Sequence, residues 1–369
     1  MNDHNLSPLI GKFRQTLLKI KDAQATDIHL CAGSPWYFRV GNNFMSLGAE
    51  SKITVPEMEE IIKHLIVNSH KIEKHKIDNF IDFLTDFDCS YSLEGVGRFR
   101  VNITSQRGTF ALVLRPIPME NPTFQSLKLP PVLEKITLSG KGLILVSGTG
   151  SSGKTSTIAA MINFLNNQTG KKILTIENPI EYLHVNNKSI IIQREVGTDV
   201  YDFKTALNAS LHQNVDLIYI SEIHDAEVVK LMFNVLTNGI TVIAELQAQN
   251  VHNTIQYLIS LVPESEQEYA RIILADNLNA VICQKLIPPA EGTQRVMALE
   301  ILRNNQEVRD LILNEKNYEH YKEIMDQNEQ KYGMISFSNT AEKLNKHNLI
   351  ESHWYEILKG ENKNKEKQD

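Results

Sequence analysis

Strict alternation of apolar and polar residues is the clearest pattern in the chain, and it covers residues 87–116. Apolar side chains recur there at every second position, in three runs separated by Glu94-Gly95-Val96-Gly97 and by Arg107-Gly108. A period of two that is broken by glycine turns is typical of antiparallel strands with one buried face. We therefore predict a three-stranded meander.

Two helical patterns and a shorter alternating segment precede the meander. Residues 6–21 carry apolar positions at helical spacing, and residues 28–45 alternate through two glycine-containing turns. These patterns predict a helix followed by a hairpin. Pro56, which acidic residues follow, predicts the start of another helix, because proline and acids both suit a first turn. The first part of the chain is thus expected to be an α+β domain.

Three arginines occupy the polar positions of the predicted meander. The alternation places Arg98 and Arg100 side by side on the face opposite its apolar residues, and it places Arg115 on the face opposite Leu114. Neighbouring arginines on a sheet are usually solvent-exposed, but they could also contact a bound phosphate. The pattern leaves both interpretations open.

Alternating strands and helices replace this pattern after the prolines at 115–122 and 130–131. Apolar strands are predicted at 173–177, 217–221 and 241–246, with helices between them. Such alternation is typical of a parallel sheet that is covered on both faces. The expected organisation is a domain over 1–118, a linker over 119–131, an α/β core over 132–290, a helical region over 291–358 and a disordered charged tail over 359–369.

A glycine-rich loop joins the first strand of this core to a helix. The loop consists of Gly148, Thr149, Gly150, Ser151, Ser152, Gly153, Lys154 and Thr155. It has the form G-x-x-x-x-G-K-[ST], in which backbone N–H groups and the helix N-terminus bind phosphates. Lys154 is then expected to reach the β- and γ-phosphates, and Thr155 to ligate magnesium. The motif predicts binding of ATP and Mg²⁺.

Composition and charge describe an ordinary globular protein of 369 residues, with 42% hydrophobic and 22% charged residues. The net charge of -6, from 38 basic and 44 acidic residues, provides no basic field for nucleic acid. Cys31, Cys89 and Cys283 lie far apart, which argues against a zinc site and favours a reducing cytoplasm. The sequence shows no signal-peptide pattern and no membrane-spanning apolar run, so no direct membrane insertion is expected.

Acidic residues follow two of the predicted strands. Glu222 ends the apolar run that begins at Asp216, as in the second motif of P-loop NTPases, and would help to hold magnesium. Glu177 and Glu181 follow an earlier strand, and one of them could orient the attacking water. Acids at the start of a helix are an equally good interpretation of this pair.

Several stretches together resemble the PilT and PilU branch of the type IV pilus motor ATPases, which belong to the secretion ATPase superfamily. They are Thr26-Asp-Ile-His-Leu, Phe38-Arg-Val, Arg98-Phe-Arg-Val-Asn, Leu174-Thr-Ile-Glu-Asn-Pro-Ile-Glu181, Gln193-Arg-Glu-Val-Gly197 and Glu307-Val-Arg-Asp-Leu-Ile312. The resemblance covers nearly the whole chain. It implies a mixed α/β fold, with a PAS-like N-terminal domain followed by a RecA-like ATPase domain and C-terminal helices.

The same resemblance implies a partner set and a location. Members of the branch form homohexamers on the cytoplasmic side of the inner membrane, where they act on a pilus platform protein and power pilus retraction. A paralogous retraction ATPase is a further implied partner. The resemblance assigns Glu177 as the catalytic acid, Glu222 as the Walker B acid, Arg98, Arg100 and Arg115 as nucleotide-contacting residues, Gln247 as the position of a histidine near the γ-phosphate, and Arg309 as the arginine of the C-terminal motif on which retraction depends.

The chain also departs from the pattern of that branch. The positions concerned are Asn178 in place of Asp, Ser221 in place of Gly, His224 in place of Arg, Ile240 and Gln247 in place of two histidines, and Leu313 in place of a second arginine. These changes predict retained nucleotide binding with slow hydrolysis. A PilU-like accessory subunit is therefore an alternative to a retraction motor. A pilus-assembly or secretion ATPase fits less well, because such proteins typically carry a longer N-terminal region and a four-cysteine zinc insertion.

Overall fold

The computed structural model describes residues 7–23, 25–41, 43–118, 120–292 and 294–360, and it contains two compact units. The first unit comprises the residues up to Asn121 together with Pro179–Leu183 and Glu195–Asp199. The second unit comprises Pro122–Asn178, His184–Arg194 and the residues from Val200 onward. Two short loops from the middle of the chain therefore belong to the first unit.

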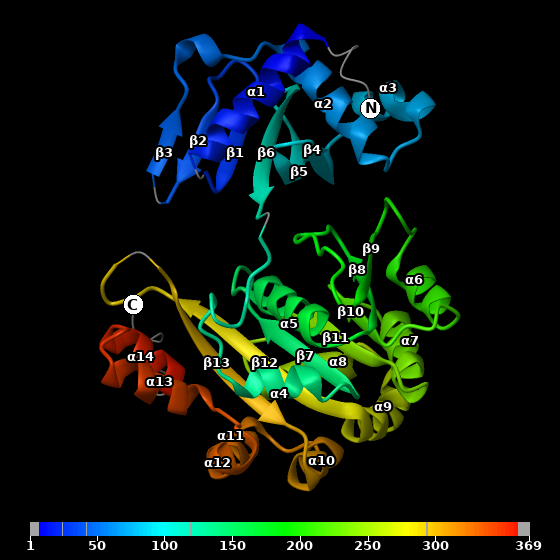
Figure 1. Cartoon of the computed structure of the whole chain (residues 1–369), viewed down its shortest axis with the longest axis vertical. Helices are drawn as coiled ribbons and strands as arrows, with labels where there is room; N and C mark the ends of the chain where they lie inside the picture. Colours follow the sequence, from blue (N-terminus) through cyan, green and yellow to red (C-terminus); the bar gives the residue numbers. More distant parts are fainter. Residues whose placement is uncertain (1–6, 24, 42, 119, 293, 361–369) are drawn as a thin grey trace. The chain divides into compact units, whose positions relative to one another are not determined.

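An antiparallel sheet, six-stranded in the described residues, forms the first unit in the order β3-β2-β1-β6-β5-β4 (Figure 1). The strands are β1 (Asp27–Cys31), β2 (Tyr37–Val40), β3 (Asn43–Ser46), β4 (Asp86–Leu93), β5 (Gly97–Gln106) and β6 (Thr109–Ile117). The helices are α1 (Pro8–Asp22), α2 (Val55–Ser69) and α3 (Ile77–Asp82), with 3-10 turns at Ala49–Ser51 and Lys74–Lys76. The apolar sides of α1 and α2 pack on one face of the sheet.

The local patterns predicted for this unit are confirmed, apart from residue 6, which lies outside the described residues. The meander turns tightly because Arg107 and Gly108 both have positive φ, 48° and 72°, as a two-residue hairpin loop requires. The resulting register places Arg100 directly opposite Arg115 on neighbouring strands. The helix predicted at Pro56 begins one residue earlier and is capped by Thr54, whose backbone N–H donates to the Glu57 carboxylate.

A sheet of seven described strands forms the centre of the second unit, in the order β13-β12-β7-β11-β10-β8-β9. The strands are β7 (Leu143–Gly148), β8 (Lys172–Glu177), β9 (Ile190–Glu195), β10 (Leu217–Ile220), β11 (Thr241–Leu246), β12 (Leu278–Ile287) and β13 (Val296–Arg303). The helices are α4 (Val132–Leu138), α5 (Lys154–Gln168), α6 (Phe203–Ser210), α7 (Ala226–Thr237), α8 (Val251–Ser260), α9 (Glu264–Asn277), α10 (Gln306–Leu313), α11 (Tyr318–Gln327), α12 (Glu329–Tyr332), α13 (Phe337–Lys346) and α14 (Ser352–Lys359).

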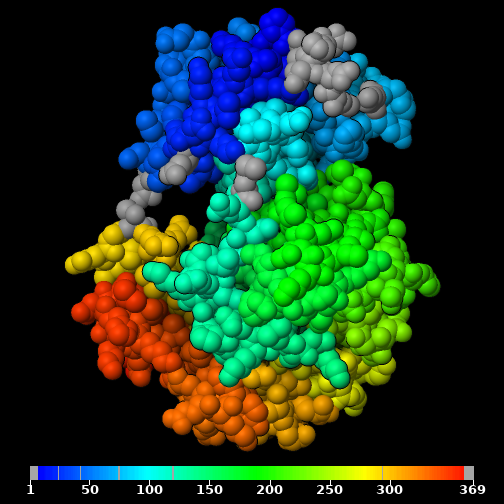
Figure 2. All heavy atoms as spheres, in the orientation of Figure 1, coloured from blue at the N-terminus to red at the C-terminus, as the bar shows by residue number. Residues whose placement is uncertain are grey.

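Helices cover both faces of this sheet, as the strand-helix alternation predicted. Side chains of α4 and α5 form one apolar cluster with alternate residues of the strands. The intervening strand residues are buried as well, on the face contacted by α7 and α8. Strands β8, β10, β11, β7 and β12 run parallel, so their carboxyl ends share one edge. The space-filling view shows the orange and red C-terminal helices continuous with the rest of this unit (Figure 2).

The region after Pro288-Pro289 differs from the prediction, which made it helical from residue 291. Residues 296–303 instead form β13, which pairs with β12 in antiparallel fashion. The misread segment, Val-Met-Ala-Leu-Glu-Ile-Leu-Arg, is a short and nearly continuous apolar run, a pattern that a buried strand and a helix share. Lys359, placed in the predicted tail, ends α14, and residues 361–369 of that tail lie outside the described residues.

The longest described helices, α1, α2 and α5, have 15 residues each. A membrane-spanning helix needs about 20 consecutive residues that are predominantly apolar. Of the helices that the structure describes, none has the length and apolar character of a membrane span.

Burial disfavours the protonated form of two histidines, one in each unit. Desolvation lowers the pKa of His184 to about 4 and has the same main effect on the pKa of His64. The His184 Nδ1 atom is buried and has no hydrogen-bond partner in the part of the chain that the structure describes, and His64 Nε2 lies 3.0 Å from the Tyr91 hydroxyl. Because the folded-state pKa lies below the unfolded value near 6.5, both rings favour the folded state only while they are neutral.

We therefore expect the protein to lose stability as the pH falls from 6.5 towards 4. For His184 the loss should not exceed about 1.4 kcal/mol per pH unit, the full value for one proton. Thermal unfolding at pH 7.5 and 5.5 measures it. His184→Gln and His64→Gln should each reduce the difference between the two pH values, whereas an unchanged difference in the double variant would contradict this explanation.

Candidate nucleotide site

The predicted phosphate loop lies between β7 and α5. Gly148 ends the strand with φ 154°, and Gly153 precedes the helix with φ 87°. Ser151 between them also has positive φ, 58°, which is uncommon for a residue with a Cβ atom. The chain thereby turns sharply enough for α5 to begin at Lys154, and the positive end of that helix faces the loop.

The neighbouring strand β12 supports the loop from one side. A Cβ atom at Gly148 would lie 2.4 Å from the Gln284 carbonyl oxygen, so only glycine fits there. The Gln284 side chain also donates from Nε2 to the Ser152 carbonyl oxygen at 2.7 Å. Gln284 is fully buried, and the sequence analysis did not identify it. Its backbone and side chain together fix both ends of the Gly148–Ser152 segment.

The loop lysine and threonine meet an acid that the sequence analysis also missed. Lys154 Nζ donates to the Thr149 carbonyl oxygen at 2.9 Å and lies 3.6 Å from Glu245 Oε1. The Thr155 hydroxyl donates to Glu245 Oε2 at 3.2 Å, and the Tyr219 hydroxyl donates to the same oxygen at 3.2 Å. Glu245 is the one charged residue of β11, and a charge inside an apolar strand was the signal that could have revealed it.

The residues present fit a magnesium nucleotide. The Ser152 hydroxyl is buried and has no hydrogen-bond partner among the described residues, as a group that awaits a phosphate would be. Thr155 and Glu245 offer oxygen atoms, which Mg²⁺ prefers, and Lys154 offers positive charge. The described residues contain no group of three His, Cys, Asp or Glu side chains that could hold a metal ion by themselves. In a complex with magnesium nucleotide, phosphate oxygens and water would be the other ligands.

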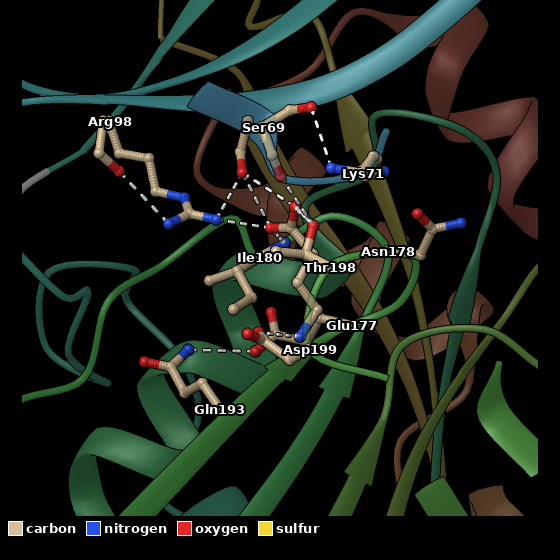
Figure 3. Close-up of polar contacts among 12 residues, drawn as sticks. Ser69, Lys71, Arg98, Glu177, Asn178, Ile180, Gln193, Thr198 and Asp199 are labelled. Atoms are coloured by element: carbon tan, nitrogen blue, oxygen red, sulfur yellow. Dashed lines mark hydrogen bonds and ion pairs between the residues drawn. The ribbon is translucent and has the colours of Figure 1, made fainter. Parts of the chain in front are cut away.

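Glu177, the expected catalytic acid, ends β8 at the same sheet edge. Its side chain is buried, and Oε1 accepts a hydrogen bond from the Thr175 hydroxyl at 2.6 Å. Oε1 also accepts from Gln193 Nε2 at 3.1 Å (Figure 3). These two donors come from β8 itself and from β9. They orient the carboxylate, which is what a base that positions water requires.

Glu222 and Gln247 lie beyond the ends of β10 and β11. The Glu222 side chain is 51% exposed, and its carboxylate lies 3.9 Å from His224 Nδ1. Gln247 is exposed, two residues after Glu245. Two of the departures from the family pattern meet at this edge, because the Asn178 backbone N–H donates to the Ser221 hydroxyl at 3.1 Å. The Ser221 side chain therefore ties the end of β10 to the end of β8.

Arg98 in the first unit belongs to a buried ion pair. Its Nη2 atom lies 2.5 Å from Glu195 Oε2 and donates to the Ser90 hydroxyl at 2.6 Å (Figure 3). The side chains are 18% exposed for Arg98 and 1% for Glu195. The Glu195 carboxylate also accepts from the Ile180 backbone N–H and the Thr198 hydroxyl. The interpretation of Arg98 as a solvent-exposed residue is therefore wrong.

The other two arginines of this sheet face have more accessible partners. Arg100 Nη1 lies 3.4 Å from Glu181 Oε1, with both side chains about 40% exposed. Arg115 pairs with Asp27, and its side chain is 63% exposed. Glu181, the second candidate for orienting water, is thus an ion-pair partner within the first unit. Among the residues described, a pocket of about 770 Å³ is lined by Arg100, Arg115 and Glu181.

Arg309 lies away from the phosphate loop in the second unit. It is a residue of α10 and forms an ion pair with Asp276, near the end of α9. Because β12 begins at Leu278, directly after α9, this pair is at the amino end of the strand. The nucleotide residues occupy the carboxyl ends, so the structure does not bring Arg309 into the candidate site.

Comparisons with known proteins agree with this site. The family model for the type II/IV secretion system protein matches residues 98–352. The chain belongs to this family. It is 35% identical over 301 residues to the type IV pilus retraction ATPase PilT of Pseudomonas aeruginosa, an alignment that covers 81% of this chain and 85% of PilT. It is 30% identical to the type IV pilus ATPase PilU of the same organism, over 82% of this chain and 77% of PilU.

A solved structure gives the same result for the fold. A crystal structure of the pilus retraction motor PilT with bound ADP matches with a TM-score of 0.81 and 32% identity, and it covers 96% of this chain and 97% of that one. The predicted resemblance to the PilT and PilU branch is confirmed, as is the mixed α/β fold with a RecA-like domain. The chain is a P-loop ATPase of this family.

Arg98 and Arg100 should differ in their effect on stability. Arg98→Ala leaves the buried Glu195 carboxylate without its cation, which should lower the free energy of unfolding by about 3 to 5 kcal/mol. Arg100→Ala removes a half-exposed pair and should cost at most about 1 kcal/mol. Urea unfolding of the full chain measures both.

A second substitution distinguishes loss of the ion pair from loss of packing. Adding Glu195→Gln to Arg98→Ala removes the uncompensated charge and should recover part of the lost stability. Equal losses for Arg98→Ala and Arg100→Ala, with no recovery in the double variant, would mean that Arg98 is an ordinary surface residue.

Proposed function

We propose that this chain is an ATP-hydrolysing motor subunit that drives retraction of type IV pili. The observation that carries the proposal is the loop from Gly148 to Thr155, with Lys154 and Thr155 beside an acid at the carboxyl edge of a parallel sheet. The similarity to PilT over most of the chain supports pilus retraction as the process that ATP hydrolysis drives. The proposed assembly is a cytoplasmic homohexamer that contacts a pilus platform protein at the inner membrane.

Each side chain of the site would have its own role in ATP hydrolysis. Lys154 would hold the β- and γ-phosphates, and the loop N–H groups would surround them. Magnesium, held by Thr155 and acidic groups at this edge, including Glu222, would stabilise negative charge on the transferring phosphoryl group. Glu177, fixed by Thr175 and Gln193, would position the attacking water.

The arginines of the first unit have separate roles in this proposal. Arg100 and Arg115 have accessible partners, so they are the residues of this sheet face that could exchange a carboxylate for nucleotide in the ring. Arg98 is held by Glu195 and Ser90, and its contribution to the nucleotide site would be to shape the loop at residues 195–199. Arg309 would couple hydrolysis to movement from the opposite edge of the sheet.

A second candidate function is supported by one specific observation. Both positions at which the family carries histidines hold other residues, Ile240 and Gln247, and PilU is among the relatives. We therefore propose, as the alternative, that the chain is a slow, PilU-like accessory subunit that works with a paralogous retraction ATPase. Steady-state ATP turnover of the purified protein, alone and mixed with the paralogue, separates the two functions.

Lys154→Ala should abolish ATP turnover and pilus retraction without unfolding the protein, because it removes the charge that binds the phosphates. Nucleotide affinity and turnover are measured in vitro, and twitching motility is measured in a deletion strain that expresses the variant. Lys141→Ala, at an exposed lysine outside the loop, is the matched control. Unchanged hydrolysis by Lys154→Ala would reject the site.

Gln247→His should raise turnover and make it pH-dependent. An amide can donate to a phosphate oxygen but cannot become cationic, whereas an imidazolium can make a charge-assisted hydrogen bond. If that bond forms only in the transition state, the gain is about ten-fold to a hundred-fold. Turnover from pH 6 to 8.5 measures it, with ATP affinity in parallel. The variant should be faster at the acid end, and a pH profile identical to that of the parent would place Gln247 outside the catalytic centre.

A further inference from the structure

The position of Glu245 follows from the register of three parallel strands. Glu245 lies opposite Val146 on β7, two residues before Gly148 begins the phosphate loop. Its neighbour Ala244 lies opposite Ile220, the last residue of β10. The carboxylate therefore reaches the start of α5 from the strand beside the loop. It is 17% exposed, and the side chain of Lys154 is 6% exposed.

The Glu245 carboxylate forms an ion pair with Lys154, and nucleotide would compete for that lysine. Lys154 lies 3.6 Å away, and the hydroxyls of Thr155 and Tyr219 donate to Glu245 Oε2. If Lys154 turns to the β- and γ-phosphates, Glu245 loses this ion pair and gains phosphate oxygens as neighbours. A cation bound beside this carboxylate and the phosphates would offset the repulsion between them.

We propose that Glu245 is the acid that makes nucleotide binding depend on magnesium in this protein. The proposal rests on the ATP site proposed above. Thr155, whose hydroxyl donates to Glu245, is the loop residue that the motif assigns to magnesium, so the carboxylate lies where the metal shell must form. Tyr219 holds Oε2 from the neighbouring strand and fixes the orientation of the carboxylate.

Glu222 lacks these features. It follows β10 by two residues, is half exposed and has His224 as its described partner. By motif it is the expected magnesium acid, yet it has no described contact with Lys154 or Thr155. Of these two acids, Glu245 is the one with described contacts to Lys154 and Thr155. An experiment can distinguish their roles.

The decisive measurement is the affinity of ADP with excess Mg²⁺ and with EDTA, by calorimetry or with a fluorescent ADP analogue. The ratio of the two dissociation constants gives the coupling between metal and nucleotide. For Glu245→Gln this coupling should fall about ten-fold to a hundred-fold, because a carboxylate contact to the cation is lost and its repulsion of the phosphates without metal is relieved. Tyr219→Phe should lower the coupling by a smaller factor. Glu222→Gln should leave most of it, and Glu342→Gln, at an exposed glutamate of α13, is the charge-matched control.

Three results would overturn the inference. Coupling that is unchanged in Glu245→Gln would remove Glu245 from the metal shell. Coupling that is lost in Glu222→Gln but kept in Glu245→Gln would return the role to Glu222. An equal rise in affinity with and without Mg²⁺ would make Glu245 a competitor of the phosphates and no partner of the metal. Failure of the parent protein to bind ADP under any condition would instead reject the proposed function, which keeps the two failures distinct.

Discussion

The tight parallel packing of β7 between β11 and β12 is the constraint on which the candidate site depends. Gly148 lies so close to the Gln284 carbonyl oxygen that a Cβ atom would be 2.4 Å away, which fixes where the loop leaves the sheet. On the other side of β7, the same pairing holds Glu245 level with Val146. The pairing of β7 with its two neighbours therefore positions the phosphate loop, Gln284 and Glu245. A shift of that register would separate Lys154 from the Glu245 carboxylate.

A different constraint organises the residues around Glu195 in the first unit. A carboxylate that is 1% exposed needs a cation and several donors, and Arg98, Ser90, Ile180 and Thr198 supply them. These partners come from β4, β5 and the two loops at residues 179–183 and 195–199. The ion pair therefore joins segments that are about a hundred residues apart in sequence, and it gives Arg98 a structural task that an arginine free to reach a phosphate would not have.

The sequence predicted features that depend on neighbouring residues, and it missed features that depend on residues far away in the chain. The phosphate loop, the meander and its Arg107-Gly108 turn depend on neighbouring residues, and the structure confirms them as elements. The partners of Lys154 and Arg98 lie 91 and 97 positions away, so they depend on strand order and register, which periodicity does not specify. β13 was misread because a short apolar run fits a buried strand and a helix equally well.

The departure from the family pattern at Gln247 and the acid Glu245 have the same electrostatic effect. Ile240 precedes β11 and therefore lies at the amino end of that strand, away from the phosphate loop. At Gln247, where the resemblance implies a histidine, the side chain cannot become cationic, and Glu245 adds a negative charge beside Lys154. Both changes make the surroundings of the phosphates less positive. Nucleotide at this site would then depend on compensating charge from outside the loop, either from a divalent cation or, in the ring proposed above, from Arg100 and Arg115. We expect such a site to respond more steeply to metal and to assembly than one that has further cationic side chains beside its lysine, which would suit control of activity by the ring proposed above.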